Sequence, residues 1–212
     1  SRLFLGTGKF SSAAALKAAI EASGTELVTV AMRRVDLNKQ ERDDILGAID
    51  RSKVKIMLNT SGARTAEDAV KIARFGKDFF QWIKLEIHPD PIHLLPDPIE
   101  TLKAAEIIVN EGFLVLPYIH AEPVLAKRME DVGVRYIIYT DIDCDGMLSG
   151  PNLRELTLLN DAVSCNITAS GGIKDSDDIK ALKDAGLYGA ICGRSIYKGT
   201  LDLREALEIC RE

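Results

Sequence analysis

The feature that most constrains the fold is a regular alternation of short apolar runs with longer amphipathic stretches. The alternation occurs eight times in 212 residues, about once every 26 residues. The apolar runs have almost no polar interruptions, which is typical of parallel strands covered by helices on their outer face. Strands are predicted over Leu3–Leu5, Leu27–Met32, Val54–Leu58, Trp82–Ile87, Leu114–Ile119, Tyr136–Thr140, Asn166–Ala169 and Gly189–Cys192.

The intervening stretches predict helices over Ser12–Ala22, Lys39–Ile49, Thr65–Lys77, Asp97–Asn110, Glu122–Asp131, Asn152–Leu159, Ser176–Ala185 and Asp202–Cys210. Thr65 and Ser176 are expected to cap the starts of their helices with a side-chain oxygen. Eight such units without a Pro/Gly-rich linker favour one domain over residues 1–212, an α/β fold of the (β/α)8 TIM-barrel class with a closed parallel eight-stranded barrel. An open doubly wound sheet is the alternative.

Composition excludes several classes of protein. The formal net charge of −5 disfavours non-specific binding to nucleic acid. Apolar runs fall well short of the ~20 residues of a membrane span, so no membrane association is expected. The four cysteines have no paired or metal-ligand spacing, which favours reduced thiols in the cytoplasm. No metal site and no cofactor are predicted.

The first candidate site is the run from Trp82 to His88. Alternation places Ile83, Leu85 and Ile87 on one face, whereas Lys84 and Glu86 share the face that points into a barrel. Burial lowers the pKa of a lysine toward the range in which its free amine attacks a carbonyl, and a nearby carboxylate can move the proton. A structural ion pair is the alternative interpretation.

The second candidate is the acidic segment 141–146. Its D-x-D-x-D-G pattern imitates a calcium loop, but position twelve is Asn152 rather than Glu and a strand precedes it, so calcium is rejected. Carboxylates just past a strand end suit acid–base chemistry at a barrel mouth, and Asp143 is the candidate. Acids that cap the following turn are the alternative.

The third candidate is a pair of glycine-bearing loops after the seventh and eighth strands. Glycines let backbone N–H groups approach an anion, and barrels commonly hold phosphate at these two loops. We therefore predict a phosphate or phosphosugar ligand here. Two tight turns without a ligand are the alternative. The candidate residues are Ser170, Gly171, Gly172, Gly193, Arg194 and Ser195.

Residues 1 to about 133 resemble thiazole synthase of thiamine biosynthesis. The resemblance rests on the segments Ser1–Phe10, Val30–Val35, Asn59–Ala63, Trp82–Glu86, Leu94–Asp97 and Leu116–Ile119. It implies that Lys84 forms an imine with the ketone of 1-deoxy-D-xylulose 5-phosphate, beside Glu86. It also implies a small carrier protein that delivers sulfur as a thiocarboxylate, and a glycine-derived imine that completes the ring.

Residues from about 134 to 212 instead resemble phosphoribosylformimino-5-aminoimidazole carboxamide ribotide isomerase of histidine biosynthesis. The matching segments are Tyr139–Asn152, Ala169–Ile173 and Gly193–Gly199. In that resemblance Asp143 corresponds to a carboxylate of the sixth strand, and the two glycine loops correspond to one phosphate site. The aspartate that thiazole synthases carry in the seventh strand is here Ala169.

The two resemblances together predict a chimera, with five βα units of one family (1–133) joined to three of another (134–212) near Val132–Arg135. The first expectation is therefore a recombined, engineered barrel that binds phosphate or a phosphosugar with weak or no turnover. A working thiazole synthase that uses a Schiff-base lysine is the alternative. A working Amadori isomerase is the second alternative.

Overall fold

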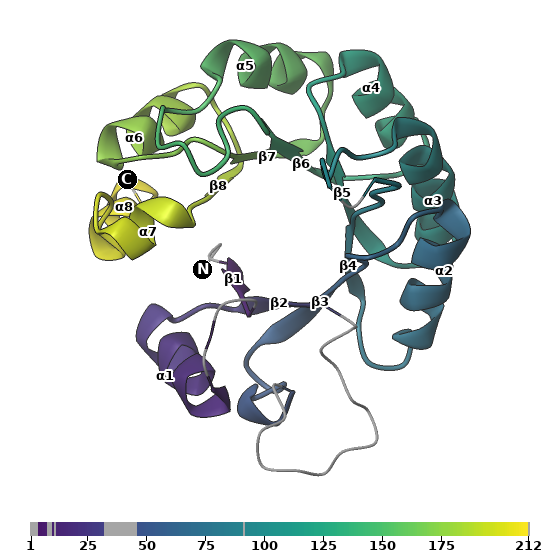
Figure 1. The fold of residues 1–212 in the computed structure, drawn as a ribbon, viewed down its shortest axis with the longest axis horizontal. Helices are drawn as coiled ribbons and strands as arrows, with labels where there is room; N and C mark the ends of the chain where they lie inside the picture. Colours follow the sequence, from purple (N-terminus) through teal and green to yellow (C-terminus); the bar gives the residue numbers. More distant parts are fainter. Residues whose placement is uncertain (1–3, 8–9, 11, 32–45, 91, 212) are drawn as a thin grey trace. The chain divides into compact units, whose positions relative to one another are not determined.

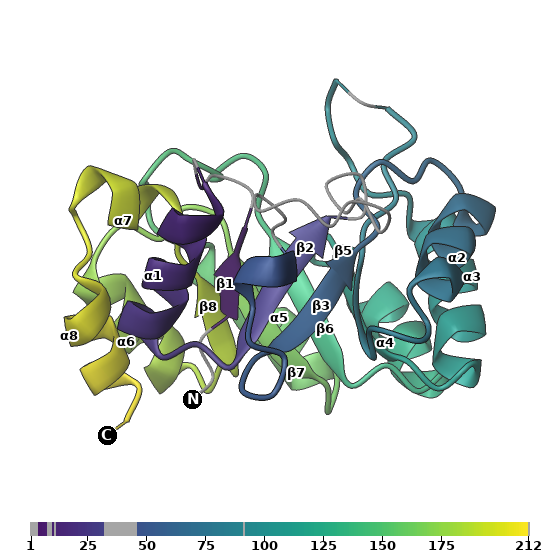
Figure 2. The ribbon, with the colours of Figure 1, turned by 90° about the horizontal axis from the view of Figure 1, so that it is seen from below.

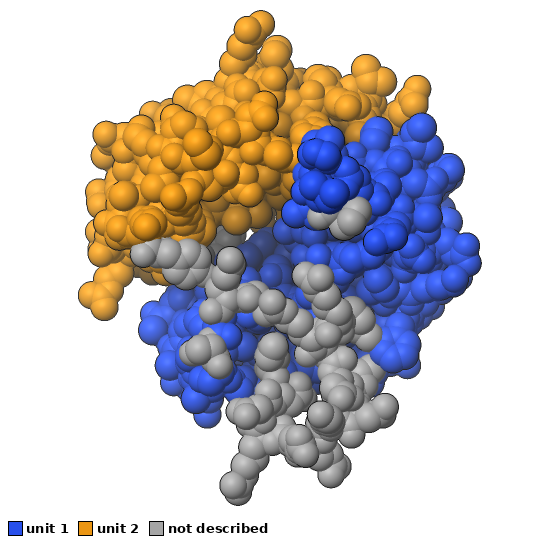
Figure 3. All heavy atoms as spheres, viewed as in Figure 1, with its two compact units in different colours: residues 1–115 blue, residues 116–212 orange. Residues whose placement is uncertain are grey.

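The computed structural model describes residues 4–7, 10, 12–31, 46–90 and 92–211. These residues form two compact units, residues 1–115 and residues 116–212, here called unit 1 and unit 2 (Figure 3). Each unit has its own run of parallel strands with helices between them, and each is described by itself below.

Unit 1 contains four strands that pair in chain order. β1 pairs with β2, β2 with β3 and β3 with β4, all in parallel. The register places Asn59, the last residue of β3, beside Lys84 of β4. The strands are β1 (Phe4–Gly6), β2 (Leu27–Ala31), β3 (Lys55–Asn59) and β4 (Trp82–Leu85).

The helices of unit 1 follow its strands. α2 and α3 lie side by side (Figures 1 and 2). Thr65 accepts a hydrogen bond from the Asp68 N–H at the start of α2, as predicted. The helix predicted over Lys39–Ile49 lies largely outside the described residues, and its described end is a short 3-10 turn, η2 (Leu46–Ala48). The helices are α1 (Ala13–Ser23), α2 (Ala66–Phe75) and α3 (Pro98–Asn110).

Unit 2 repeats this arrangement. β5 pairs with β6, β6 with β7 and β7 with β8, again in parallel and in chain order. β5 contains the boundary between the two units. The strands are β5 (Leu114–Ile119), β6 (Tyr136–Thr140), β7 (Asn166–Ser170) and β8 (Gly189–Ile191), and the helices are α4 (Pro123–Asp131), α5 (Leu153–Ala162), α6 (Ser176–Asp184), α7 (Arg194–Lys198) and α8 (Leu203–Ile209).

Two local expectations are wrong in unit 2. Asp175, rather than Ser176, caps α6 by accepting a hydrogen bond from the Asp178 N–H. A further short helix, α7, begins directly after Gly193 where a loop was expected. Elsewhere the predicted strands and the observed strands agree to within two residues at each end.

The strand order is the one expected of consecutive βα units. A doubly wound sheet reverses its strand order at a switch point, whereas neither unit contains such a reversal. Ile83 and Leu85 of β4, and Ile87 just beyond it, are completely buried, as the predicted outward-facing alternation requires. In the part of the chain that the structure describes, no helix combines the length and apolar character needed to cross a membrane.

Candidate functional site

Lys84 and Glu86 form an ion pair at the carboxyl end of β4. The Lys84 Nζ lies 2.7 Å from Glu86 Oε1, and the two side chains are only 21% and 12% exposed. Because successive side chains of a strand alternate between its faces, these two side chains lie on the face opposite to the fully buried Ile83, Leu85 and Ile87. The structure thus brings together the amine and the carboxylate that the sequence singled out.

The segment after β3 fixes the backbone of this pair. Thr60 is fully buried, and its hydroxyl donates to the Glu86 carbonyl and accepts from the Glu86 N–H, each at 2.8 Å. The Thr60 N–H donates to the Lys84 carbonyl, and the His88 N–H donates to the Ala63 carbonyl. Glu86 lies just past the last residue of β4, beyond the regular hydrogen bonds of the sheet. The bonds from Thr60 therefore hold its backbone in place.

Asn59 reaches the same carboxylate from β3. Its Nδ2 donates to Glu86 Oε1 at 3.2 Å, and its Oδ1 accepts from the Ser61 N–H at 2.8 Å. From the sequence, Asn59 belongs to a segment that carries a family resemblance, but no role is predicted for it. Its position beside Lys84 follows from the register between β3 and β4, which cannot be read from the sequence alone.

His88 lies beside this pair and is half-buried. Burial lowers the pKa of His88, the charge of Glu86 opposes that effect, and the charge of Lys84 adds to it. The neutral form of the imidazole is therefore favoured. His93 pairs instead with Asp90. Within the described residues, no three His, Cys, Asp or Glu side chains are grouped as a metal site requires.

In unit 2, Asp141 rather than Asp143 organises the acidic loop. Asp141 Oδ1 accepts from the N–H groups of Asp143 and Cys144, and Oδ2 accepts from Asn152 Nδ2 at 3.1 Å. An aspartate that binds the backbone two residues ahead forms an Asx turn. The Asp143 side chain is exposed. Its assignment as an acid–base residue stays a prediction.

Tyr139, in β6, connects this strand to α5 and to the acidic segment. Its hydroxyl donates to Glu155 Oε2 at 2.6 Å and lies 3.5 Å from Asp141 Oδ2. Burial, followed by the hydrogen bond to Glu155, raises the pKa of Tyr139 well above its usual range. The hydroxyl therefore keeps its proton at all physiological pH values and acts as a fixed donor to the carboxylates.

Close packing explains the two glycines after β7. Gly171 and Gly172 both have positive φ angles, +94° and +78°. A Cβ on Gly171 would lie 2.5 Å from the carbonyl oxygen of Asp141, and a Cβ on Gly172 would collide with the carbonyl of Gly150. The Asp141 N–H donates to the Ser170 carbonyl, and the Gly150 N–H donates to that of Gly172. The tight-turn interpretation therefore accounts for these glycines by itself.

The segment after β8 contacts the acidic segment 141–146 through Arg194. The Arg194 guanidinium is exposed and donates to the Gly146 carbonyl. Ser195 is fully buried, and its carbonyl accepts from the Thr200 N–H. Burial raises the pKa of the neighbouring Cys192 to about 11, so its thiol is protonated. Of the predicted phosphate residues, Arg194 therefore lies at the surface and Ser195 does not.

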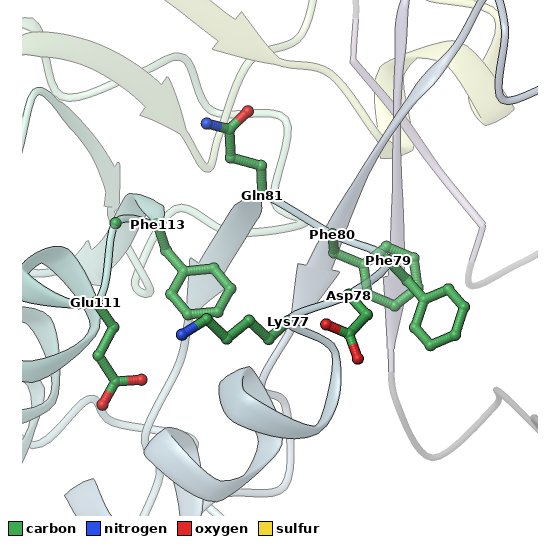
Figure 4. Close-up of a pocket in the computed structure, with 8 residues that line it drawn as sticks. Lys77, Asp78, Phe79, Phe80, Gln81, Glu111 and Phe113 are labelled. Carbon is green, nitrogen blue, oxygen red and sulfur yellow. The ribbon is translucent and has the colours of Figure 1, made fainter.

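A pocket of about 320 Å³ lies elsewhere in unit 1 (Figure 4). Residues 77–81 and 111–113 line it, so it opens between the α2–β4 and α3–β5 connections, at the end of β4 opposite to Lys84. The Lys77 charge acts on Glu111, which is bound to Arg74. None of the predicted site residues lines this pocket.

Comparison with known proteins identifies the family. The sequence model of the thiazole biosynthesis protein ThiG matches residues 1–199. The thiazole synthase of Syntrophobacter fumaroxidans is 59% identical over 140 residues, which are 65% of this chain and 54% of that protein. That of Proteus mirabilis is 58% identical over 135 residues, which are 63% of this chain and 52% of that protein. The chain thus spans about half the length of the curated relatives it matches.

Solved structures show the fold. The crystal structure of the Amycolatopsis orientalis BexX/CysO complex has a TM-score of 0.77 and 19% identity, covering 98% of this chain and 86% of that one. A native KDPGal structure has a TM-score of 0.61 and 18% identity, covering 100% of this chain and 96% of that one. The predicted class, a (β/α)8 barrel, is confirmed.

These findings correct the interpretation of the chain as a chimera. The family match continues through Val132–Arg135, where a junction between two families was expected, and ends only at residue 199. The prediction of a recombined, engineered barrel with an isomerase segment and weak or no turnover is therefore wrong. From end to end of that match, the chain belongs to the thiazole biosynthesis protein ThiG family.

Proposed function

We propose that this chain is a thiazole synthase that begins its reaction by forming an imine between Lys84 and the ketone of 1-deoxy-D-xylulose 5-phosphate. One observation carries the proposal: a largely buried lysine whose Nζ lies 2.7 Å from a carboxylate oxygen. An amine must lose its proton before it attacks a carbonyl, and Glu86 is within reach of that proton.

The step balances with these two side chains alone. Glu86 takes a proton from the Lys84 ammonium, and the free amine adds to the ketone carbon to give a carbinolamine. The carbinolamine oxygen then takes the proton back and leaves as water, and a C=N bond replaces the C=O bond. Neither oxidant nor reductant is needed. Because Glu86 returns the proton it accepted, it serves first as base and then as acid.

Later steps need a sulfur donor, which we assign to a small carrier protein that bears a thiocarboxylate. The resemblance implies this partner, and a solved structure with the same fold is a complex of two proteins. We place the reaction in the cytoplasm, because four cysteines without paired spacing suit a reducing compartment.

For unit 2 we propose a phosphate-binding role for the loops after β7 and β8. The support is the exposed Arg194 guanidinium beyond β8 and the position of glycines just after both strands, Gly171 and Gly172 after β7 and Gly193 after β8. The exposed carboxylate of Asp143 is proposed as an acid–base group of the same unit. Replacing Arg194 with Ala should weaken binding of inorganic phosphate about tenfold or more, measured by calorimetry. Unchanged affinity would remove Arg194 from the site.

Borohydride trapping tests the imine. Wild-type protein incubated with 1-deoxy-D-xylulose 5-phosphate and reduced should gain the mass of one substrate less one oxygen atom, on the peptide that contains Lys84. Lys84→Ala should gain nothing, whereas Lys17→Ala, which removes an exposed lysine of α1, should react like the wild type. The proposal fails if saturating substrate leaves no adduct, or if the adduct persists in Lys84→Ala.

A further inference from the structure

The geometry points to Asn59 as a positioning residue that holds the Glu86 carboxylate in place to exchange a proton with Lys84. The inference rests on the proposed imine chemistry and adds to it a residue on a different strand. Asn59 does not contact the reacting amine in this assignment; it acts through Glu86.

The carboxylate oxygen that binds Lys84 is the one that Asn59 holds. Lys84 Nζ and Asn59 Nδ2 both contact Glu86 Oε1, at 2.7 Å and 3.2 Å. The Asn59 amide is itself oriented, because its Oδ1 accepts from the Ser61 N–H. Each end of the amide therefore has a defined partner, and the side chain cannot flip without losing both bonds.

The shared oxygen has a consequence for the proton. A second donor on Oε1 draws negative charge away from the Lys84 ammonium, so the ammonium is held less tightly than by an unshared carboxylate. When the proton moves to the carboxylate, the amide keeps the group in the same position. Asn59 thus weakens the hold of Glu86 on the ammonium and keeps the carboxylate within reach of the proton.

A purely structural role would look different. The bond from the Ser61 N–H to Oδ1 fixes the turn after β3, and any side-chain oxygen at this position can accept it. Asn59→Asp keeps that acceptor but replaces the donor to Glu86 with a carboxylate. The variant therefore keeps the bond that fixes the turn and removes only the bond that affects proton exchange between Glu86 and Lys84.

The test measures the reactivity of Lys84 without any substrate. Trace acetylation with acetic anhydride across a pH series, quantified on the Lys84 peptide by mass spectrometry, gives the midpoint at which the amine becomes reactive. Asn59→Asp places a second carboxylate beside the Glu86 oxygen that contacts Lys84, and burial lowers the pKa of the neighbouring His88. The added charge should raise the midpoint by about one pH unit.

Two further variants complete the comparison. Asn59→Ser retains an oxygen for the turn but cannot reach Glu86, so its midpoint should rise by less than that of Asn59→Asp. Asn110→Asp makes the same charge change at an exposed end of α3 and should leave the midpoint unchanged. Because a shift of one unit leaves about a tenth of the free amine, imine trapping near neutral pH should slow about tenfold in Asn59→Asp.

The outcomes distinguish this inference from the proposed function. If wild-type protein forms no adduct with 1-deoxy-D-xylulose 5-phosphate, the proposed function fails while the acetylation midpoints still decide the role of Asn59. If Asn59→Asp is folded by circular dichroism and its midpoint equals that of Asn110→Asp, the inference is overturned. If Asn59→Asp does not fold, the midpoint of Asn59→Ser decides in the same way.

Discussion

At the scale of single residues, position 171 requires glycine for two separate reasons. Its φ of +94° is a conformation that L side chains rarely adopt, and its missing Cβ leaves room for the backbone of Asp141. The contact joins the end of β7 to the loop after β6. Backbone atoms cannot move aside as the tip of a flexible side chain can, so this position has no inexpensive substitution.

Gly171→Ala should therefore destabilise the protein by about 3 kcal/mol or more, since overpacking adds to backbone strain. Gly199→Ala is the matched control, because Gly199 has a φ of +72° with open space around it. It should cost only about 1 kcal/mol, from strain alone. Urea unfolding measures both values. Equal losses would show that the contact with Asp141 contributes nothing.

The residues of the candidate site differ in how far the sequence could predict them. Lys84 and Glu86 are two residues apart on one strand, so the period-two alternation alone places them together. Asn59 is 27 residues from Glu86, and its contact depends on the register of β3 against β4. The sequence favours Asp143 over Asp141, because it shows three acids but not which of them turns back to the backbone.

At the scale of elements, side-chain caps decide where helices begin. Asp97 caps α3 and Asp202 caps α8, each by accepting from N–H groups in the first turn. The start of α6 offers two adjacent candidates, Asp175 and Ser176, and only the backbone angles settle the choice. Asp175 is extended, as a cap must be, whereas Ser176 is already helical.

Replacing the true cap should therefore cost more than replacing its neighbour. Asp175→Ala should lower the free energy of unfolding by about 1 kcal/mol, because the Asp178 N–H loses its acceptor. Ser176→Ala should change it by only a few tenths of a kcal/mol. Thermal unfolding of the two variants beside the wild type makes the comparison. A larger loss from Ser176→Ala would show that Ser176, rather than Asp175, caps the helix.

The strands were more predictable than the short helices, for a physical reason. An apolar run of five residues is a sufficient signal when the strand is covered by helices, and all eight runs became strands. α7 has only five residues and begins after Gly193, so it shows neither a full period of apolar positions nor a side-chain cap. Glycine loops and short helix starts look alike in sequence.

At the scale of the whole molecule, the region expected to be a junction is bound into its surroundings. Met129 and Val134 are almost completely buried, and the Val134 N–H donates to the Met129 carbonyl. The Cys165 thiol donates to the Val134 carbonyl. The resemblance of 134–212 to a second family does not indicate a second origin, because short loop and turn motifs can recur in unrelated proteins of one fold.

The Glu130 carboxylate also ties this region together, and its charge makes the free energy of unfolding depend on pH. It binds Lys127 within α4 and both the hydroxyl and the N–H of Ser164, in the connection from α5 to β7. The hydrogen bond from Lys127, followed by those from Ser164, lowers the pKa of Glu130 to about 2. A carboxylate with a lowered pKa stabilises the folded chain above its unfolded pKa, and that stability is lost as pH falls toward the folded value.

Glu130→Gln should therefore be less stable than the wild type at neutral pH. The gap in urea midpoint should stay constant down to about pH 5 and close between about pH 4.5 and 2, because only the wild type loses a favourable charge in that range. Asp161→Asn, at an exposed position of α5, controls for the change in net charge. A gap that is the same at pH 3 and pH 7 would mean that the charge of Glu130 contributes nothing, and that the loss comes from the amide nitrogen of Gln in place of an oxygen that accepts from Lys127 or Ser164.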